Sequence, residues 1–228
     1  MSTSEWAVIL DMDGVIVDSE AMHVRIDARV CAEMGVQVDE KEFERYVGTP
    51  APDTWSDAKA RYRLRAPVGA LVARARELYE QALADGRFPA AVPGIVELIR
   101  ALNAEGVTVA VASSTVSDVV RRVLEELGVS DLIRACVGGD QVTRGKPHPE
   151  IYRKAATLIR IRPERCVAIE DSAPGVRSAR AAGMACVGFQ NTGSGVQDLS
   201  SATVVVDSIG ELSVRTLRTL ALTGTPPG

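Results

Sequence analysis

The stretch Ala7-Val8-Ile9-Leu10-Asp11-Met12-Asp13-Gly14 decides how this chain folds. Four consecutive apolar residues suit a strand buried on both faces, the kind found in parallel sheets, and the run breaks at Asp11. Asp11 and Asp13 are two residues apart, so an extended backbone points both carboxyl groups to the same side. Gly14 then lets the chain turn without the steric limits of a Cβ atom. The stretch therefore predicts a buried parallel strand with two acids at its carboxyl end.

Similar short apolar runs recur along the chain and predict further strands at residues 107–112, 135–137, 166–169, 185–188 and 203–206. Helical periodicity lies between several of them. The apolar residues 95, 98, 99 and 102, for example, follow the i, i+3, i+4, i+7 spacing of one helix face. Strands that alternate with helices imply right-handed crossovers. The predicted fold class is α/β, with a doubly wound parallel sheet.

Residues 19–87 differ from the rest of the chain in their sequence pattern. This segment is predicted to be helical throughout, with faces rich in arginine and glutamate. A helical block inserted after the first strand would form a separate subdomain that two hinges join to the core. The predicted domains are a catalytic core of residues 1–18 and 88–228, and an inserted α-helical cap of residues 19–87.

Composition narrows the function classes. The 228 residues carry a net charge of −4, and the basic residues are scattered rather than gathered into a stripe, which argues against nucleic acid as a partner. No apolar run approaches the roughly 20 residues that span a bilayer, and the N-terminus lacks the pattern of a secretory signal. We therefore expect a cytoplasmic protein with no membrane partner; the sequence predicts no particular oligomeric state.

Polar residues follow four of the predicted strands. Beyond Asp11 and Asp13, these are Ser113-Ser114-Thr115, Lys146 and Glu170-Asp171. Ligands bind outside the carboxyl ends of the strands in an open α/β sheet, so these side chains are expected to converge. Several acids near one point need a cation, and oxygen ligands suit Mg²⁺. The sequence therefore predicts a Mg²⁺ site that involves Asp11, Asp13, Glu170 and Asp171.

The same residues suit phosphoryl transfer. Asp11 could attack as a nucleophile while Asp13 serves as acid and base. Ser113, Ser114 and the N–H groups that follow could face a phosphate, and Lys146 could neutralise the phosphate and Asp11 together. Each motif alone has an ordinary alternative: a turn rich in Asp and Gly, a helix N-cap, or a solvated loop lysine.

The two histidines are interpreted differently. His148 sits between two prolines at a helix entrance and is interpreted as structural. His23 is at helical spacing from Ser19, so it lies near the first hinge and could contact the substrate. A structural role for His23 is the alternative.

With these residues in hand, the chain resembles the haloacid dehalogenase superfamily, whose four motifs follow strand ends in this order. The segments that carry the resemblance are Asp11-Met12-Asp13-Gly14, Ser113, Gly145-Lys146-Pro147 and Glu170-Asp171-Ser172. It implies a Rossmann-like core with an α-helical cap, Asp11 as nucleophile and metal ligand, and Asp13 as acid/base with its carbonyl on the metal. It further implies that Ser113 and Lys146 hold the phosphate and that Asp171, with Glu170, completes a Mg²⁺ site.

Within that family the sequence favours a phosphatase that acts on a small phosphorylated metabolite, such as a sugar phosphate. A β-phosphoglucomutase-like phosphomutase is the alternative. The mutase has a cap arginine just after a glycine, where this chain has Gly48-Thr49-Pro50-Ala51-Pro52. A non-catalytic binding protein on the same fold is a third possibility, which the retained Asp13 disfavours.

Overall fold

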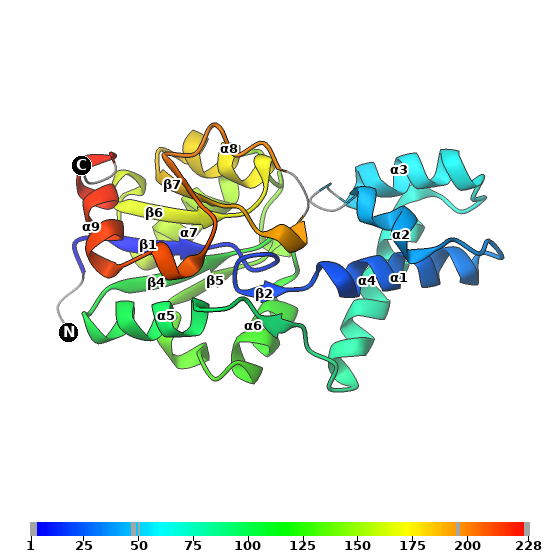
Figure 1. The fold of residues 1–228 in the computed structure, drawn as a ribbon, viewed down its shortest axis with the longest axis horizontal. Helices are drawn as coiled ribbons and strands as arrows, with labels where there is room; N and C mark the ends of the chain where they lie inside the picture. Colours follow the sequence, from blue (N-terminus) through cyan, green and yellow to red (C-terminus); the bar gives the residue numbers. More distant parts are fainter. Residues whose placement is uncertain (1–3, 47–48, 50, 195–196, 226–228) are drawn as a thin grey trace. The chain divides into compact units, whose positions relative to one another are not determined.

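The computed structural model describes residues 4–46, 49, 51–194 and 197–225. The chain divides into two compact units. The first, here called the sheet unit, lies within Met1–Asp18, Ala90–Thr192 and Val196–Gly228. The second, here called the helical unit, consists mainly of Ser19–Pro89. Both are drawn in Figure 1.

The sheet unit is built on six parallel strands in the order β5-β4-β1-β6-β7-β8. Their bounds are Ala7–Leu10 (β1), Thr108–Ala112 (β4), Ala135–Val137 (β5), Cys166–Glu170 (β6), Ala185–Phe189 (β7) and Val204–Val206 (β8). The predicted α/β class and parallel sheet are therefore confirmed, and each observed strand falls within two residues of its predicted bounds.

Helices cover both faces of this sheet (Figure 1). Their bounds are Ile95–Ala104 (α5), Ser117–Glu126 (α6), Glu150–Ile159 (α7), Ala173–Ala182 (α8) and Val214–Thr223 (α9). Helices α7 and α8 pack together over one face, and α5 and α9 contact each other over the other. Burial on both faces explains why every residue of β1 is apolar and fully buried.

Strand β1 lies at the centre of the sheet, where the strand order reverses. It pairs with β4 on one side, through Leu10 and Val111, and with β6 on the other, through Leu10 and Ile169. The residues just beyond these three strands therefore share one edge of the sheet. In open α/β sheets this point is the usual place for a ligand.

A small antiparallel ribbon of two strands, β2 (Val17–Asp18) and β3 (Ala90–Ala91), was not predicted. Each strand has only two residues, too few to show an alternating pattern in the sequence. The ribbon joins the places where the chain leaves the sheet unit and returns to it.

The helical unit contains no strand among its described residues. Its helices are Glu20–Glu33 (α1), Glu40–Phe43 (α2), Ala51–Tyr62 (α3) and Val68–Ala84 (α4), with a 3₁₀ turn at Glu44–Tyr46. Phe43 and Trp55 are both buried with ring centroids 5.9 Å apart, and Leu71 from α4 is buried too. Aromatic packing thus forms a core within this unit.

Among the residues that the structure describes, further 3₁₀ turns connect elements at Ser130–Leu132, Gly139–Gln141, Pro163–Arg165, Thr192–Ser194 and Ile209–Glu211. Across the part of the chain that the structure describes, no helix combines the length and apolar character needed to cross a membrane.

Candidate active site

Asp11 is the first residue after β1, and its placement follows from the sheet. Its backbone N–H donates to the carbonyl of Ile169 at 3.0 Å, so Asp11 continues the pairing with β6. The next residues turn sharply, with Gly14 at a φ of 82° and its carbonyl accepting from the side chain of Asn191 at 2.7 Å. This turn holds the Asp11 carboxyl group at the edge of the sheet, and the Asp11 side chain is only 9% exposed.

Lys146 joins the ends of two strands. Its ammonium lies 2.7 Å from Oδ1 of Asp11 and 2.5 Å from Oε1 of Glu170. All three side chains are buried, which strengthens the attraction between their charges compared with a pair in water. The structure therefore brings together three of the predicted site residues, from segments that are far apart in the sequence.

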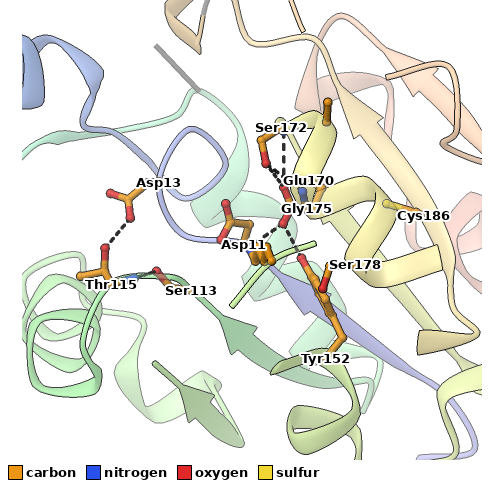
Figure 2. A network of polar contacts seen from close by, with 12 residues as sticks. Asp11, Asp13, Ser113, Thr115, Tyr152, Glu170, Ser172, Gly175, Ser178 and Cys186 are labelled. Atoms are coloured by element: carbon orange, nitrogen blue, oxygen red, sulfur yellow. Dashed lines mark hydrogen bonds and ion pairs between the residues drawn. The ribbon is translucent and has the colours of Figure 1, made fainter. Parts of the chain in front are cut away.

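The Glu170 carboxylate is held from several sides (Figure 2). Its Oε1 accepts from the Tyr152 hydroxyl at 2.7 Å in addition to Lys146. Its Oε2 accepts from the Ser172 hydroxyl at 3.0 Å, and that hydroxyl in turn accepts from the N–H of Gly175 to cap α8. Because Gly175 lacks a Cβ atom, the carboxylate packs directly against its backbone.

Asp171 completes a buried acidic cluster. One carboxylate oxygen each from Asp11, Glu170 and Asp171 lies within 4.8 Å of the others, and all three residues are buried. Like charges so close in a low-dielectric site repel unless a cation lies between them. The donor set consists of oxygen atoms alone, which is the chemistry that hard divalent cations prefer. The residues present therefore fit a divalent metal.

The pKa of Asp11 also favours a bound cation. Burial, followed by the nearby Glu170 charge, raises the pKa of Asp11 from 3.8 to about 7, although Lys146 opposes both effects. A carboxyl group with this pKa is only partly ionised near neutral pH. A bound cation would lower the pKa again and keep the carboxylate ionised.

Lys146 stays charged despite its burial. Burial alone lowers the pKa of Lys146, but the attraction of Asp11 and Glu170 outweighs it and raises the pKa above the ordinary value. The tyrosine beside it, by contrast, stays neutral: burial, and then the Glu170 charge, raise the pKa of Tyr152 well above its usual range. Tyr152 is thus a hydrogen-bond donor to Glu170 at any ordinary pH.

Asp13 is oriented by the loop that follows β4. The Thr115 hydroxyl donates to Oδ2 of Asp13 at 2.8 Å, and the Thr115 N–H donates to the hydroxyl of Ser113 at 3.0 Å (Figure 2). Ser113 is fully buried and its own N–H bonds to the carbonyl of Val137 in β5. Thr115 therefore links the first and second polar motifs, a role that the sequence alone does not indicate.

The loop after β5 packs against the loop after β4 and holds it in place. Asp140 accepts from both the N–H and the hydroxyl of Ser117, at 2.7 and 2.8 Å, at the start of α6. A Cβ atom on Gly138 would collide with the Ser117 nitrogen, and one on Gly139 with the Ser114 carbonyl oxygen. The Gly138-Gly139-Asp140 run was thus the sequence signal for this support, and it was missed.

Three other residues considered in the sequence form none of the side-chain hydrogen bonds described above. Ser114 has an exposed side chain in the loop after β4. His23 belongs to the helical unit, where its ring stacks on Tyr79 with centroids 4.7 Å apart. The substrate contacts predicted for Ser114 and His23 stay predictions. His148 is half-buried near α7, where its carbonyl accepts from Ser178 at 2.7 Å.

Comparison with known proteins agrees with this geometry. Residues 8–189 match the family model described as "Haloacid dehalogenase-like hydrolase". The chain is 29% identical over 210 residues to validoxylamine A 7'-phosphate phosphatase of Streptomyces hygroscopicus subsp. limoneus, covering 90% of this chain and 94% of that one. It is 28% identical over 217 residues to the beta-phosphoglucomutase of Bacillus subtilis, covering 92% and 93%.

Shared length varies among the relatives. The chain is 30% identical over 226 residues to SUPPRESSOR OF QUENCHING 1, a chloroplastic protein of Arabidopsis thaliana, but spans only 21% of that protein's length. Among solved structures, CbbY of Rhodobacter sphaeroides in complex with phosphate superposes with a TM-score of 0.80 at 26% identity, covering 94% of this chain and 99% of that one. The family model covers most of the chain, and the sheet order and the buried acidic cluster agree with it: this chain belongs to the haloacid dehalogenase-like hydrolase family.

Proposed function

We propose that this protein is a Mg²⁺-dependent phosphatase that hydrolyses a small phosphomonoester through an aspartyl-phosphate on Asp11. The observation that carries the proposal is the position of Lys146, whose ammonium lies within hydrogen-bond distance of Asp11 and Glu170 beside a buried acidic cluster. A lysine clamped in this way supplies a fixed positive charge next to a nucleophile, which is what an incoming phosphate dianion requires.

Asp11 acts first. Its carboxylate attacks phosphorus, the bond to the leaving oxygen breaks, and the phosphoryl group passes to Asp11. Lys146 neutralises charge on both the phosphoryl oxygens and the carboxylate, so the two anions can approach. Ser113, after β4, is proposed to hold the phosphate through the backbone N–H groups that follow it.

Asp13 is the proposed general acid and base. It protonates the leaving oxygen in the first half of the reaction and removes a proton from water in the second. The water then displaces Asp11 from phosphorus and releases inorganic phosphate. The bond from Thr115 to Oδ2 holds the Asp13 carboxyl group in one orientation for both steps.

Asp11, Asp171 and the backbone carbonyl of Asp13 are the groups proposed to hold Mg²⁺, with Glu170 beside them. When bound, the ion supplies positive charge that offsets the phosphoryl oxygens and lets several carboxylates share one site. The buried cluster of Asp11, Glu170 and Asp171 supports this assignment.

The class of substrate is inferred from relatives. Validoxylamine A 7'-phosphate phosphatase is named for a phosphorylated compound, and the CbbY structure contains phosphate. We extend these observations to a small phosphorylated metabolite, such as a sugar 6-phosphate.

A phosphomutase is the second candidate, favoured by the similarity to beta-phosphoglucomutase. A mutase needs a cation to receive the second phosphate of a bisphosphate intermediate. In this chain the corresponding segment is Gly48-Thr49-Pro50, which contains no basic residue. Gly48 and Pro50 lie outside the described residues, so the amino-acid sequence alone disfavours a mutase.

The test measures two reactions of the purified protein in the presence of Mg²⁺. A phosphatase releases inorganic phosphate from glucose 6-phosphate or p-nitrophenyl phosphate, and Asp11→Asn does not. A mutase interconverts β-glucose 1-phosphate and glucose 6-phosphate when a bisphosphate activator is present. Isomerisation faster than phosphate release would replace the first candidate by the second, and the absence of both reactions would refute both.

A further inference from the structure

Tyr152 lies at the centre of the site without being one of its predicted members. It belongs to α7, six residues after Lys146, and is fully buried. Its hydroxyl points at Glu170 and donates to Oε1 at 2.7 Å (Figure 2). The same oxygen accepts from Lys146 at 2.5 Å. One carboxylate oxygen therefore joins the tyrosine to the lysine.

The tyrosine ring also faces the lysine. The Lys146 ammonium lies 5.3 Å from the centroid of the Tyr152 ring, within the range of a cation–π contact. Tyr152 thus meets Lys146 in two ways, directly through its ring and indirectly through its hydroxyl. The body of the ring packs in the apolar core between the sheet and helices α7 and α8, so its position is set by the fold.

The Glu170 carboxylate has little freedom to find another donor if the Tyr152 hydroxyl is removed. Its Oε2 accepts from Ser172, and its carboxylate rests against Gly175. The hydroxyl of Tyr152 is the contact that holds Oε1 on the Lys146 side of the carboxylate. Without that donor, the shared oxygen would be held by the lysine alone, and the lysine could be drawn toward Glu170 and away from Asp11.

We infer that Tyr152 is a positioning residue: its hydroxyl fixes Oε1 of Glu170, and Glu170 in turn keeps the Lys146 ammonium aimed at Asp11 and the phosphate. The inference rests on the proposed function, because Lys146 is there the residue that meets the phosphate. If Tyr152 only filled the core, its ring would be sufficient. The positioning role depends on its hydroxyl, which bonds to Glu170.

Tyr152→Phe tests this because it keeps the ring and removes the hydroxyl. The readout is the dissociation constant of inorganic phosphate, measured by calorimetry with Mg²⁺ present, which needs no turnover. We expect Tyr152→Phe to weaken phosphate binding about fivefold, the scale of one hydrogen bond. Tyr62→Phe is the matched control, because Tyr62 also faces a glutamate (Glu42 Oε2, 3.4 Å) but does so in the helical unit, and it should leave phosphate binding unchanged.

A double-mutant cycle shows whether the effect passes through Glu170. In a Glu170→Gln background, Tyr152→Phe should change phosphate binding by less than about twofold, since residues that act along one path are not additive. Equal weakening in both backgrounds, or no weakening in the wild-type background, would overturn the inference. A lowered Tm with unchanged phosphate binding would likewise mean that the hydroxyl only stabilises the core.

The two proposals fail in different ways. If the wild-type protein hydrolyses p-nitrophenyl phosphate and Tyr152→Phe binds phosphate equally well, only the positioning role is lost. If the wild-type protein neither hydrolyses the ester nor binds phosphate, the proposed function is lost and the role of Tyr152 with it.

Discussion

Gly175→Ala is the substitution whose effect the structure specifies most sharply. Gly175 lies in the first turn of α8, and a Cβ atom there would sit 1.9 Å from Oε1 of Glu170 and 2.0 Å from its Oε2. The carboxylate would have to withdraw by about 1 Å, since Cβ atoms essentially never lie closer than 3.0 Å to another heavy atom. Glu170 is fully buried and hydrogen-bonded to Lys146, Tyr152 and Ser172, so it cannot move without disturbing them.

The magnitude follows from that displacement. A misplacement of about 1 Å in groups that orient a reaction costs on the order of 100-fold in rate, or roughly 3 kcal/mol. We therefore expect Gly175→Ala to lower kcat/KM by about 100-fold. Stability should change much less, because alanine favours a helix by about 1 kcal/mol over glycine and offsets part of the strain.

The assay compares kcat/KM and Tm for Gly175→Ala and for Gly69→Ala, its matched control. Gly69 lies near the start of α4 in the helical unit, and a Cβ atom added there meets no heavy atom within 4 Å. The control should keep wild-type activity. A Gly175→Ala protein with wild-type kcat/KM would refute the reasoning, because Glu170 would then work equally well in another position.

Three other predictions follow from the same site. In the metal-free protein, Asp11→Asn should stabilise the fold by up to about 4 kcal/mol at pH 8. Folding raises the pKa of Asp11 from 3.8 to about 7, so ionised Asp11 opposes folding above that pH. This gain in the free energy of unfolding should shrink as the pH falls from 7 to 4 and vanish below. Urea unfolding at pH 8, 5.5 and 3.5 measures it, and a gain that does not depend on pH would contradict the prediction. Thr115→Val should lower kcat about tenfold with little change in KM, since Asp13 loses the donor that orients it. Steady-state kinetics measure it, Thr115→Ser should restore the rate, and wild-type kcat in Thr115→Val would remove the threonine from the mechanism. Chelation should abolish activity and Mg²⁺ restore it, while Asp171→Asn should raise the half-saturating Mg²⁺ concentration at least about tenfold in a titration; full activity in EDTA would exclude a metal requirement.

Much of the fold could be predicted because the central strands are buried on both faces. A run such as residues 7–10 has no polar position, so both its strand character and its parallel pairing are visible in the sequence. The ribbon of β2 and β3 could not be predicted, since two residues per strand carry no periodicity. Its pairing of Val17 with Ala91 depends on where the chain leaves and re-enters the sheet unit.

The site was predictable where chemistry is unusual and missed where it is ordinary. Acids beside an apolar strand, such as Asp11, are costly without a function, so they stand out in a sequence. Tyr152 and Gly175 were not singled out, because an apolar-facing tyrosine and a glycine within a helix carry no mark of a site in the sequence. Their roles depend on Glu170, a neighbour that only the folded chain brings to them. Thr115 was seen as one hydroxyl among three, and its bond to Asp13 spans 102 positions of the sequence.

The most direct test of the central claim is to trap the phosphoryl group on Asp11. The protein is quenched in acid during turnover of a phosphate ester with Mg²⁺, reduced with borohydride, digested and analysed by mass spectrometry. Borohydride converts an acyl phosphate to an alcohol and leaves free carboxyl groups unchanged. The account predicts the reduced side chain at position 11, in the peptide that contains Asp13, and predicts none without substrate. If the protein turns over the ester but Asp11 is not reduced, or a different acid is reduced instead, the account is contradicted.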